Sequence, residues 1–204
     1  MTHTSPDIAA LIGSRICHDL ISPVGAIANG LELMTLSGVE AGPEFSLVDD
    51  SARGANARIR FFRMAFGKAS RDQMVGAAEL LGILEAIYTG PQMLDWQISE
   101  PLPRPLARMV FLALLCLERT IPRGGTLAAT GGPEALVLRA EADALTIQGA
   151  HWDILQTGIA PEDLPPAQVQ FPLLYAYAFE AGCTLLPEVG ESSARITLKS
   201  EPRT

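Results

Sequence analysis

The sequence predicts an α+β protein: a long helical hairpin, followed by a domain in which helices lie on one side of a mainly antiparallel sheet. Two observations lead to this fold class. Apolar residues recur every three or four positions through the first 66 residues, which is the period of a helix face. Beyond residue 70, helical segments alternate with short strand candidates bounded by glycine and proline, as in layered α+β domains. We therefore expect two domains, residues 1–69 and 70–204.

The first helix is expected to begin at Ser5-Pro6-Asp7, because serine can cap a helix and proline suits its first turn. It is expected to end near Ser37-Gly38. At about 100° per residue, His18 falls nearly opposite the centre of the apolar stripe on this helix. The stripe consists of Ile8, Ile12, Ile16, Leu20, Val24, Ile27, Leu31 and Met34.

A second helix is expected to start at Gly42-Pro43-Glu44 and to end at Gly67. A lone hairpin cannot cover the apolar stripes of both helices. We therefore expect two chains to pair their antiparallel hairpins into a four-helix bundle, which makes the protein a homodimer. The alternative is a monomer in which the C-terminal part folds back over the hairpin. The stripe of the second helix is Phe45, Val48, Ala52, Ala55, Ile59, Phe62 and Phe66.

Composition limits the possible partners. The chain has 204 residues, of which 48% are hydrophobic, and a formal net charge of −8. Because binding through phosphates depends on clustered Lys and Arg, we expect no nucleic-acid partner. No apolar run reaches the roughly 18 to 20 residues that span a bilayer, so we expect a cytoplasmic protein without membrane contact. The three cysteines lack C-x-x-C spacing, and we interpret them as small apolar core residues.

One segment of the first helix predicts chemistry, and its centre is His18. A phosphoacceptor histidine needs an exposed ring nitrogen as nucleophile, and a neighbour that accepts a hydrogen bond from the other nitrogen. Asp19 can supply that carboxylate. Pro23 has no amide hydrogen, so it frees the carbonyl of Asp19 and is expected to bend the helix just beyond His18. We predict His18 and Asp19 as catalytic residues and Pro23 as a structural residue.

Two polar residues share the face of His18. Arg15 and Ser22 lie three residues before it and four residues after it, and we expect them to contact phosphoryl oxygens or an acidic partner site. A metal site formed by Cys17, His18 and Asp19 is not expected, because consecutive helical residues diverge by about 100°. The plainer interpretation, an ordinary surface histidine, stays open at this point.

The motif resembles a known one. His18-Asp19-Leu20-Ile21-Ser22-Pro23 resembles the H-box of sensor histidine kinases, H-[ED]-L-x-[ST]-P, in which the histidine is phosphorylated. Residues 14–30 are more specifically similar to the ChpT-type histidine phosphotransferases of alphaproteobacterial phosphorelays, and weaker similarity extends over most of the chain. This resemblance implies a dimeric helical hairpin, followed by a degenerate kinase-type ATPase domain that no longer binds nucleotide.

The C-terminal domain is expected to contain helices over residues 72–89, 103–120 and 168–181. Short strands are expected at residues 93–98, 126–129, 135–140 and 144–148, and a closing hairpin at 184–187 and 194–199. In histidine kinases, an Asn on the helix before a Pro-x-Gly-Gly turn holds magnesium, and an Asp-x-Gly-x-Gly loop reaches adenine. Here residues 108–119 contain no Asn, and Cys116 or a neighbouring apolar residue stands in the corresponding region. Residues 146–165 contain no such loop. We therefore expect no nucleotide site, no metal site and no autokinase activity.

The resemblance implies a function. His18 is expected to accept a phosphoryl group from the Asp of a receiver domain in a hybrid histidine kinase, and to pass it to the Asp of a response regulator of the CtrA type. Leu11 and Ile21 are expected to help bind a receiver helix. Each receiver would bring its own magnesium, so no cofactor is expected. Two alternatives remain: a sensor-type histidine kinase with a cryptic ATP site, and a non-catalytic dimeric adaptor.

Overall fold

The computed structural model describes residues 6–38 and 42–200, with side chains described at residue 13, at residues 16–18 and from residue 20 onward. The chain divides into two compact units, residues 1–68 and residues 69–204.

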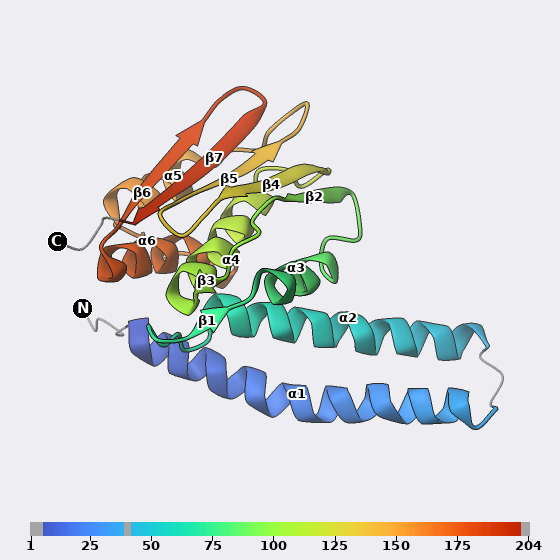
Figure 1. Cartoon of the computed structure of the whole chain (residues 1–204). Helices are drawn as coiled ribbons and strands as arrows, with labels where there is room; N and C mark the ends of the chain where they lie inside the picture. Colours follow the sequence, from blue (N-terminus) through green and yellow to red (C-terminus); the bar gives the residue numbers. More distant parts are fainter. Residues whose placement is uncertain (1–5, 39–41, 201–204) are drawn as a thin grey trace. The chain divides into compact units, whose positions relative to one another are not determined.

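The first unit is an antiparallel helical hairpin (Figure 1). Helix α1 spans Pro6–Leu36, and α2 spans Pro43–Phe66. Gly38 follows α1 with a φ of 81°, a left-handed conformation that glycine adopts without a steric penalty. Gly42 and Gly67 flank α2. Both helices therefore lie where the apolar periodicity predicts them.

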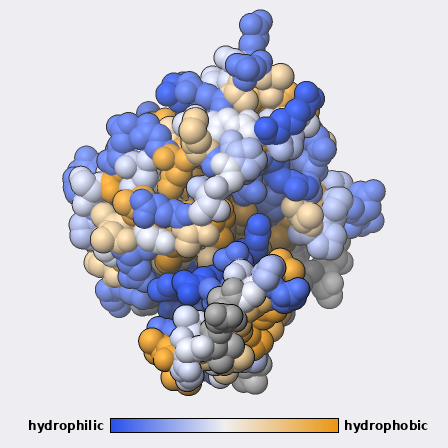
Figure 2. Space-filling model, turned by 90° about the vertical axis from the view of Figure 1, so that its right-hand side faces the viewer, coloured by the Kyte–Doolittle hydropathy of each residue, from blue (hydrophilic) through white to orange (hydrophobic). Residues whose placement is uncertain are grey.

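Among the described side chains of α1, the predicted single stripe is wrong in one respect, because it divides into two rows; Ile8 and Ile12 of that stripe lie outside the described side chains. Cys17 is 5% exposed, and Val24 and Leu31 are half-buried. In contrast, the uncovered row of α1 is exposed by 53% at Ile16, 46% at Leu20, 52% at Ile27 and 45% at Met34. A contact between two helices covers only a narrow sector of each surface. Figure 2, which faces the connection between α1 and α2, shows apolar surface at that end of the hairpin.

The second unit contains a five-stranded sheet in the order β2-β4-β5-β7-β6. Only β2 and β4 run parallel, and the other neighbouring strands pair antiparallel, as predicted. Helices cover one face of this sheet (Figure 1), which confirms the α+β class. The strands are β2 Gln92–Trp96, β4 Gly125–Gly131, β5 Ala135–Glu141, β6 Cys183–Val189 and β7 Ser193–Ser200.

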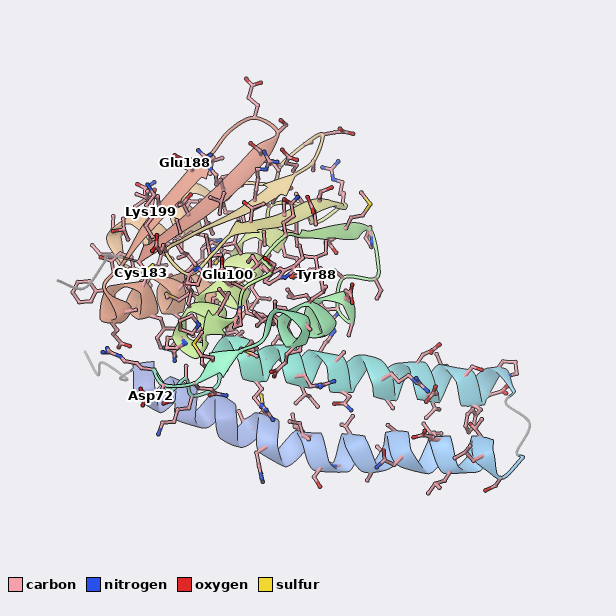
Figure 3. The ribbon with its side chains drawn as sticks, in the orientation of Figure 1. Asp72, Tyr88, Glu100, Cys183, Glu188 and Lys199 are labelled. Carbon is pink, nitrogen blue, oxygen red and sulfur yellow. The ribbon has the colours of Figure 1, made fainter. Side chains whose placement is uncertain are left out.

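The opposite face of the sheet carries polar side chains. Glu188 of β6 stands opposite Arg195 of β7 in the register, and the two form an ion pair. Glu188 and Lys199 are labelled on these two strands in Figure 3. Alternate residues of β7, such as Ile196 and Leu198, are buried instead, because side chains alternate between the two faces of a strand.

Over residues 69–200, four helices complete the second unit, together with the short 3-10 helix η1 Pro166–Gln168 and a two-stranded pair of β1 Met74–Val75 with β3 Leu102–Pro103. Gly182 ends the last helix with a φ of 64°. The helices are α3 Ala77–Glu85, α4 Arg104–Glu118, α5 Gly149–Thr157 and α6 Gln170–Ala181.

Two predictions for this unit are wrong. The helix expected over residues 72–89 is shorter, because β1 pairs with β3 and α3 starts only after Gly76. Residues 144–148 are not a strand. Thr146 donates one backbone hydrogen bond to the carbonyl of Thr120, and α5 follows, with Trp152, Ile154 and Leu155 buried.

The core of the second unit is centred on α4. Phe111, Leu112 and Leu114 are fully buried. The guanidinium of Arg108 lies 3.4 Å from the centroid of the Tyr177 ring on α6, a cation–π contact that lets a charged group pack inside the helical layer. All three cysteines are free and buried, as predicted. Among the described residues, no helix is long and apolar enough to cross a membrane.

Candidate functional site

The candidate site lies on α1, which continues as one helix across Pro23. His18 is exposed, while its neighbour Cys17 is 5% exposed. Because adjacent helical residues point about 100° apart, this difference places His18 to one side of the contact with α2. Burial raises the pKa of the Cys17 thiol, and the nearby Arg63 guanidinium lowers it in part. Cys17 is therefore a protonated packing residue beside His18.

The exposed apolar row of α1 lies on the other side of the helix. Ile16 and Leu20, each two residues from His18, point about 200° away from it, and Ile27 points about 180° away. A partner that covers this row therefore leaves His18 accessible. The exposed imidazole of His18 therefore lies on a surface that is separate from the apolar row.

The other predicted site residues differ in their exposure. Ser22 and Pro23 are exposed, and Ile21 is half-buried, one helical turn from Cys17. The side chains of Leu11, Arg15 and Asp19 lie outside the part of the chain that the structure describes. Of the predicted set, the structure thus brings Ser22 to the face of His18 and turns Ile21 toward the hairpin contact.

A segment of α2 that the sequence motif around His18 does not include lies at the level of His18. A Cβ atom added to Gly13 would lie 2.9 Å from the carbonyl oxygen of Phe66. In an antiparallel pair with equal rise per residue, this contact places His18 at the level of residue 61. The segment Arg58-Ile59-Arg60-Phe61-Phe62-Arg63 surrounds that position. Three arginines within six residues of an acidic chain were the signal available in the sequence.

The second unit contains a cavity of about 390 Å³ between the end of α4, α5 and the start of α6. Cys116 on its wall is fully buried, and burial raises its pKa well above the ordinary value. Its protonated thiol is a poor ligand for magnesium, which prefers oxygen. The described residues contain no group of three or more His, Cys, Asp or Glu side chains that could hold a metal ion.

His151 also lines this cavity. Its ring stacks on Phe171 with a centroid distance of 5.1 Å. Burial lowers the pKa of His151, and the charge of Arg119 lowers it further. A neutral imidazole packed on a phenyl ring is a structural element of the helical layer. Glu118 is the single acidic residue in the cavity lining and lies there with Arg119, so the lining has no cluster of acidic ligands.

Comparison with known proteins gives consistent results. The family model described as "Histidine phosphotransferase C-terminal domain" matches residues 78–193, which is more than half of the chain. "Protein phosphotransferase ChpT" from Brucella abortus (strain 2308) is 37% identical over 131 residues. That alignment covers 63% of this chain and 62% of the Brucella protein, so it spans less than two thirds of that relative.

A solved structure described as a bacterial phosphotransferase covers nearly the whole fold. It aligns with a TM-score of 0.71 and 29% identity, over 98% of this chain and 98% of that chain. The hairpin followed by a helix-covered sheet is therefore an arrangement that a solved phosphotransferase shares. On the strength of the family match, the chain belongs to the histidine phosphotransferase family.

Proposed function

We propose that this protein is a histidine phosphotransferase of a phosphorelay, in which His18 receives a phosphoryl group from an aspartyl phosphate and returns it to another aspartate. The observation that carries the proposal is the exposed imidazole of His18, within an H-box-like segment of a chain that belongs to the histidine phosphotransferase family. The non-catalytic adaptor gives no reason for this motif.

The reaction needs only one nucleophile from this chain. A ring nitrogen of His18 attacks the phosphorus of the aspartyl phosphate, a P–N bond forms, and the P–O bond to aspartate breaks. The carboxylate leaves with the electron pair. In the second step the carboxylate of another receiver attacks the same phosphorus, and the ring nitrogen leaves. Each receiver brings its own magnesium, so this chain contributes the position of the ring.

The predicted neighbours of His18 have separate roles in this scheme. Asp19 accepts a hydrogen bond from the second ring nitrogen, which fixes the tautomer and stabilises positive charge on the ring. Arg15 and Ser22 contact the phosphoryl oxygens or the rim of the receiver. Leu11 and Ile21 supply apolar contact to a receiver helix. Pro23 leaves the carbonyl of Asp19 without its usual helical donor.

The protein acts as a homodimer in this proposal, through a four-helix bundle formed by two hairpins. The support is the exposed apolar row of α1 together with Val48 and Phe62 of α2, which are 48% and 40% exposed. Contiguous apolar surface of this kind is typical of interfaces. Covering these rows would leave both copies of His18 accessible, because each lies on the opposite side of its helix.

The partners are two receiver domains in the cytoplasm: one from a hybrid histidine kinase and one from a response regulator of the CtrA type. ATP is not a substrate in this proposal. Cys116 cannot replace the magnesium-binding Asn of a kinase, because its buried thiol stays protonated. Incubation with labelled ATP alone tests this point: no label should appear on the protein, and labelling of His18 would establish the kinase alternative.

The central experiment is phosphotransfer from a prephosphorylated receiver to the wild-type protein, with His18→Ala and His151→Gln in parallel. We expect acid-labile, alkali-stable label on the wild type and on His151→Gln, and no label on His18→Ala. Transfer that proceeds unchanged with His18→Ala would eliminate His18 as the carrier and favour the adaptor.

A second variant tests the role of Asp19. Asp19→Asn keeps the size of the side chain but removes its charge, so we expect transfer to slow by about 10²-fold or more while receiver binding stays nearly constant. Equal loss of binding and transfer would contradict the assigned role.

A further inference from the structure

The line of contact between α1 and α2 divides the surface of the hairpin into two sides. The side on which a residue lies follows from its rotation about the helix axis relative to a buried residue at the contact. Cys17 of α1 and Ile59 of α2 are 5% and 8% exposed, so both lie close to the line of contact between the helices. Relative to Cys17, His18 is turned by about +100° and Leu20 by about −60°.

The same rotation applies to α2. Relative to Ile59, Arg60 is turned by about +100° and Arg63 by about +40°, whereas Phe62 is turned by about −60°. A two-fold rotation relates the members of an antiparallel helix pair, so rotations of equal sign lie on the same side of the pair. Arg60 and Arg63 therefore share the side of His18, and Phe62 shares the side of Leu20.

The position of the two arginines along the hairpin axis also brings them close to His18. The contact of Gly13 with Phe66 places His18 opposite residue 61, which lies between the two arginines. The Arg63 guanidinium acts electrostatically on the Cys17 thiol, so its charge reaches the position next to His18. Arg60 and Arg63 are both exposed.

We propose that Arg60 and Arg63 of α2 form a second wall of the phosphotransfer site, facing His18, and hold the anionic side of an incoming receiver active site. This inference rests on the proposed function. The ligand chemistry is a phosphoryl group surrounded by carboxylates, which guanidinium groups bind through paired N–H donors. Two arginines beside His18 give an acidic partner a local positive surface on a chain with a net charge of −8.

Charge complementarity to an acidic receiver gives the arginines of α2 a function. The overall negative charge repels an acidic receiver, so a local cationic wall is needed to steer the encounter and to orient the phosphoryl group toward the ring. An Arg on each side of residue 61 places charge along the wall, and the apolar row on the other side of the hairpin stays free for a second copy of the chain.

The test compares the double variant Arg60→Gln/Arg63→Gln with the control Arg58→Gln. Arg58 is exposed and belongs to the same segment, but it is turned by about −100° from Ile59 and lies on the side of Phe62. The full chain is used in each case. The measurements are the second-order rate of phosphotransfer from a prephosphorylated receiver at several salt concentrations, the affinity for that receiver, and direct phosphorylation of His18 by phosphoramidate.

We expect the double variant to lose about tenfold or more of its transfer rate at low salt and much of the salt dependence. Arg58→Gln should stay within about twofold of wild type. Phosphoramidate should label His18 equally in all three proteins, because a small donor needs no docking wall. A double lysine variant should recover part of the rate, since it restores charge without the planar fork.

Each outcome has one meaning. If the wild type accepts phosphate, and the double variant and Arg58→Gln do so at equal rates and with equal salt dependence, the role of the arginine wall is overturned. His18 remains the carrier in that case. Absence of transfer to the wild type from every phosphorylated receiver would overturn the proposed function, and the inference with it. Loss of phosphoramidate labelling in the double variant alone would show that the arginines act on the ring and not on the receiver.

Discussion

Helices α1 and α4 bury very different shares of their residues. Twelve of the fifteen residues of α4 are buried, and several lie at 0% exposure. Among the described side chains of α1, only Cys17 is buried. Eleven of the fifteen residues of α4 and seventeen of the thirty-one residues of α1 are hydrophobic, so composition explains only part of this difference. Helix α4 is surrounded by α6, β5 and β7 within its own unit, whereas α1 packs against one helix.

The difference separates a unit that has its own apolar core from a hairpin that leaves an apolar row exposed. The second unit has an apolar core of its own around α4, as an independently folding domain does. The hairpin exposes one apolar row and presents its histidine on the other side of the same helix. Apolar surface that a hairpin cannot cover is available for a second hairpin, and the polar side is available for receivers.

The largest expected effect comes from placing a charge in the uncovered row of α1. Ile27→Asp should convert a dimer into monomers, because burying an unpaired carboxylate in each copy is strongly unfavourable. Loss of two isoleucine contacts of about 1.5 to 3 kcal/mol each adds to this, so the dimer dissociation constant should rise by more than about 100-fold. Sedimentation or light scattering at micromolar concentration measures it.

Phe179→Asp is the matched control, because Phe179 of α6 is 78% exposed and lies in the other unit. It should leave the oligomeric state unchanged. A wild-type protein that is monomeric at all accessible concentrations would remove the four-helix bundle. A dimer that tolerates Ile27→Asp would place the interface elsewhere.

The next effect is expected in the core of the second unit. Leu112→Ala should lower the free energy of unfolding by about 2 to 5 kcal/mol, because Leu112 is fully buried and the surrounding helices and strands refill such a cavity only in part. Leu36→Ala at the end of the hairpin, where the side chain is 77% exposed, should change it by less than about 0.5 kcal/mol. Urea unfolding followed by circular dichroism measures both, and equal effects would contradict the contrast between the units.

A smaller effect is expected where α1 approaches α2 most closely. Gly13→Ala would place a Cβ atom 2.9 Å from the carbonyl oxygen of Phe66 and 3.1 Å from its Cβ, so the helices must move apart at a cost of about 1 to 3 kcal/mol. In contrast, Gly25→Ala meets nothing within 4 Å and should gain up to about 1 kcal/mol of helix propensity. Opposite shifts of the hairpin melting temperature are expected, and shifts of the same sign would show that the two helices are not in contact at Gly13.

The sequence predicted elements that have a clear period and failed where tertiary contacts decide. Both hairpin helices follow from apolar spacing and from Pro6, Pro43 and Gly67. In contrast, α5 has a buried Trp152 but no long periodic stripe, and its helical state depends on packing against α6 and β6. Short helices of this kind draw their stability from tertiary contacts.

The candidate site shows the same division. The H-box-like motif around His18 is local, so the sequence reveals it. The arginines at 60 and 63 become part of the same surface only through the register between Gly13 and Phe66, which no local pattern contains. The division of the α1 stripe into a buried row and an uncovered row also follows from the position of α2.

The smallest expected effect is a difference between the two units in how their stability depends on pH. The pKa of His151 is lowered in the folded protein by burial and by Arg119, so as pH falls the unfolded chain binds this proton first. The resulting stability is present above the unfolded pKa of about 6.5 and is lost as pH falls through the lower folded pKa. Unfolding of the second unit should therefore depend more steeply on pH between about 7 and 5 in wild type than in His151→Gln, with no matching change in the hairpin. Equal slopes in urea titrations at each pH would mean that burial and the charge of Arg119 place no cost on the protonated ring of His151.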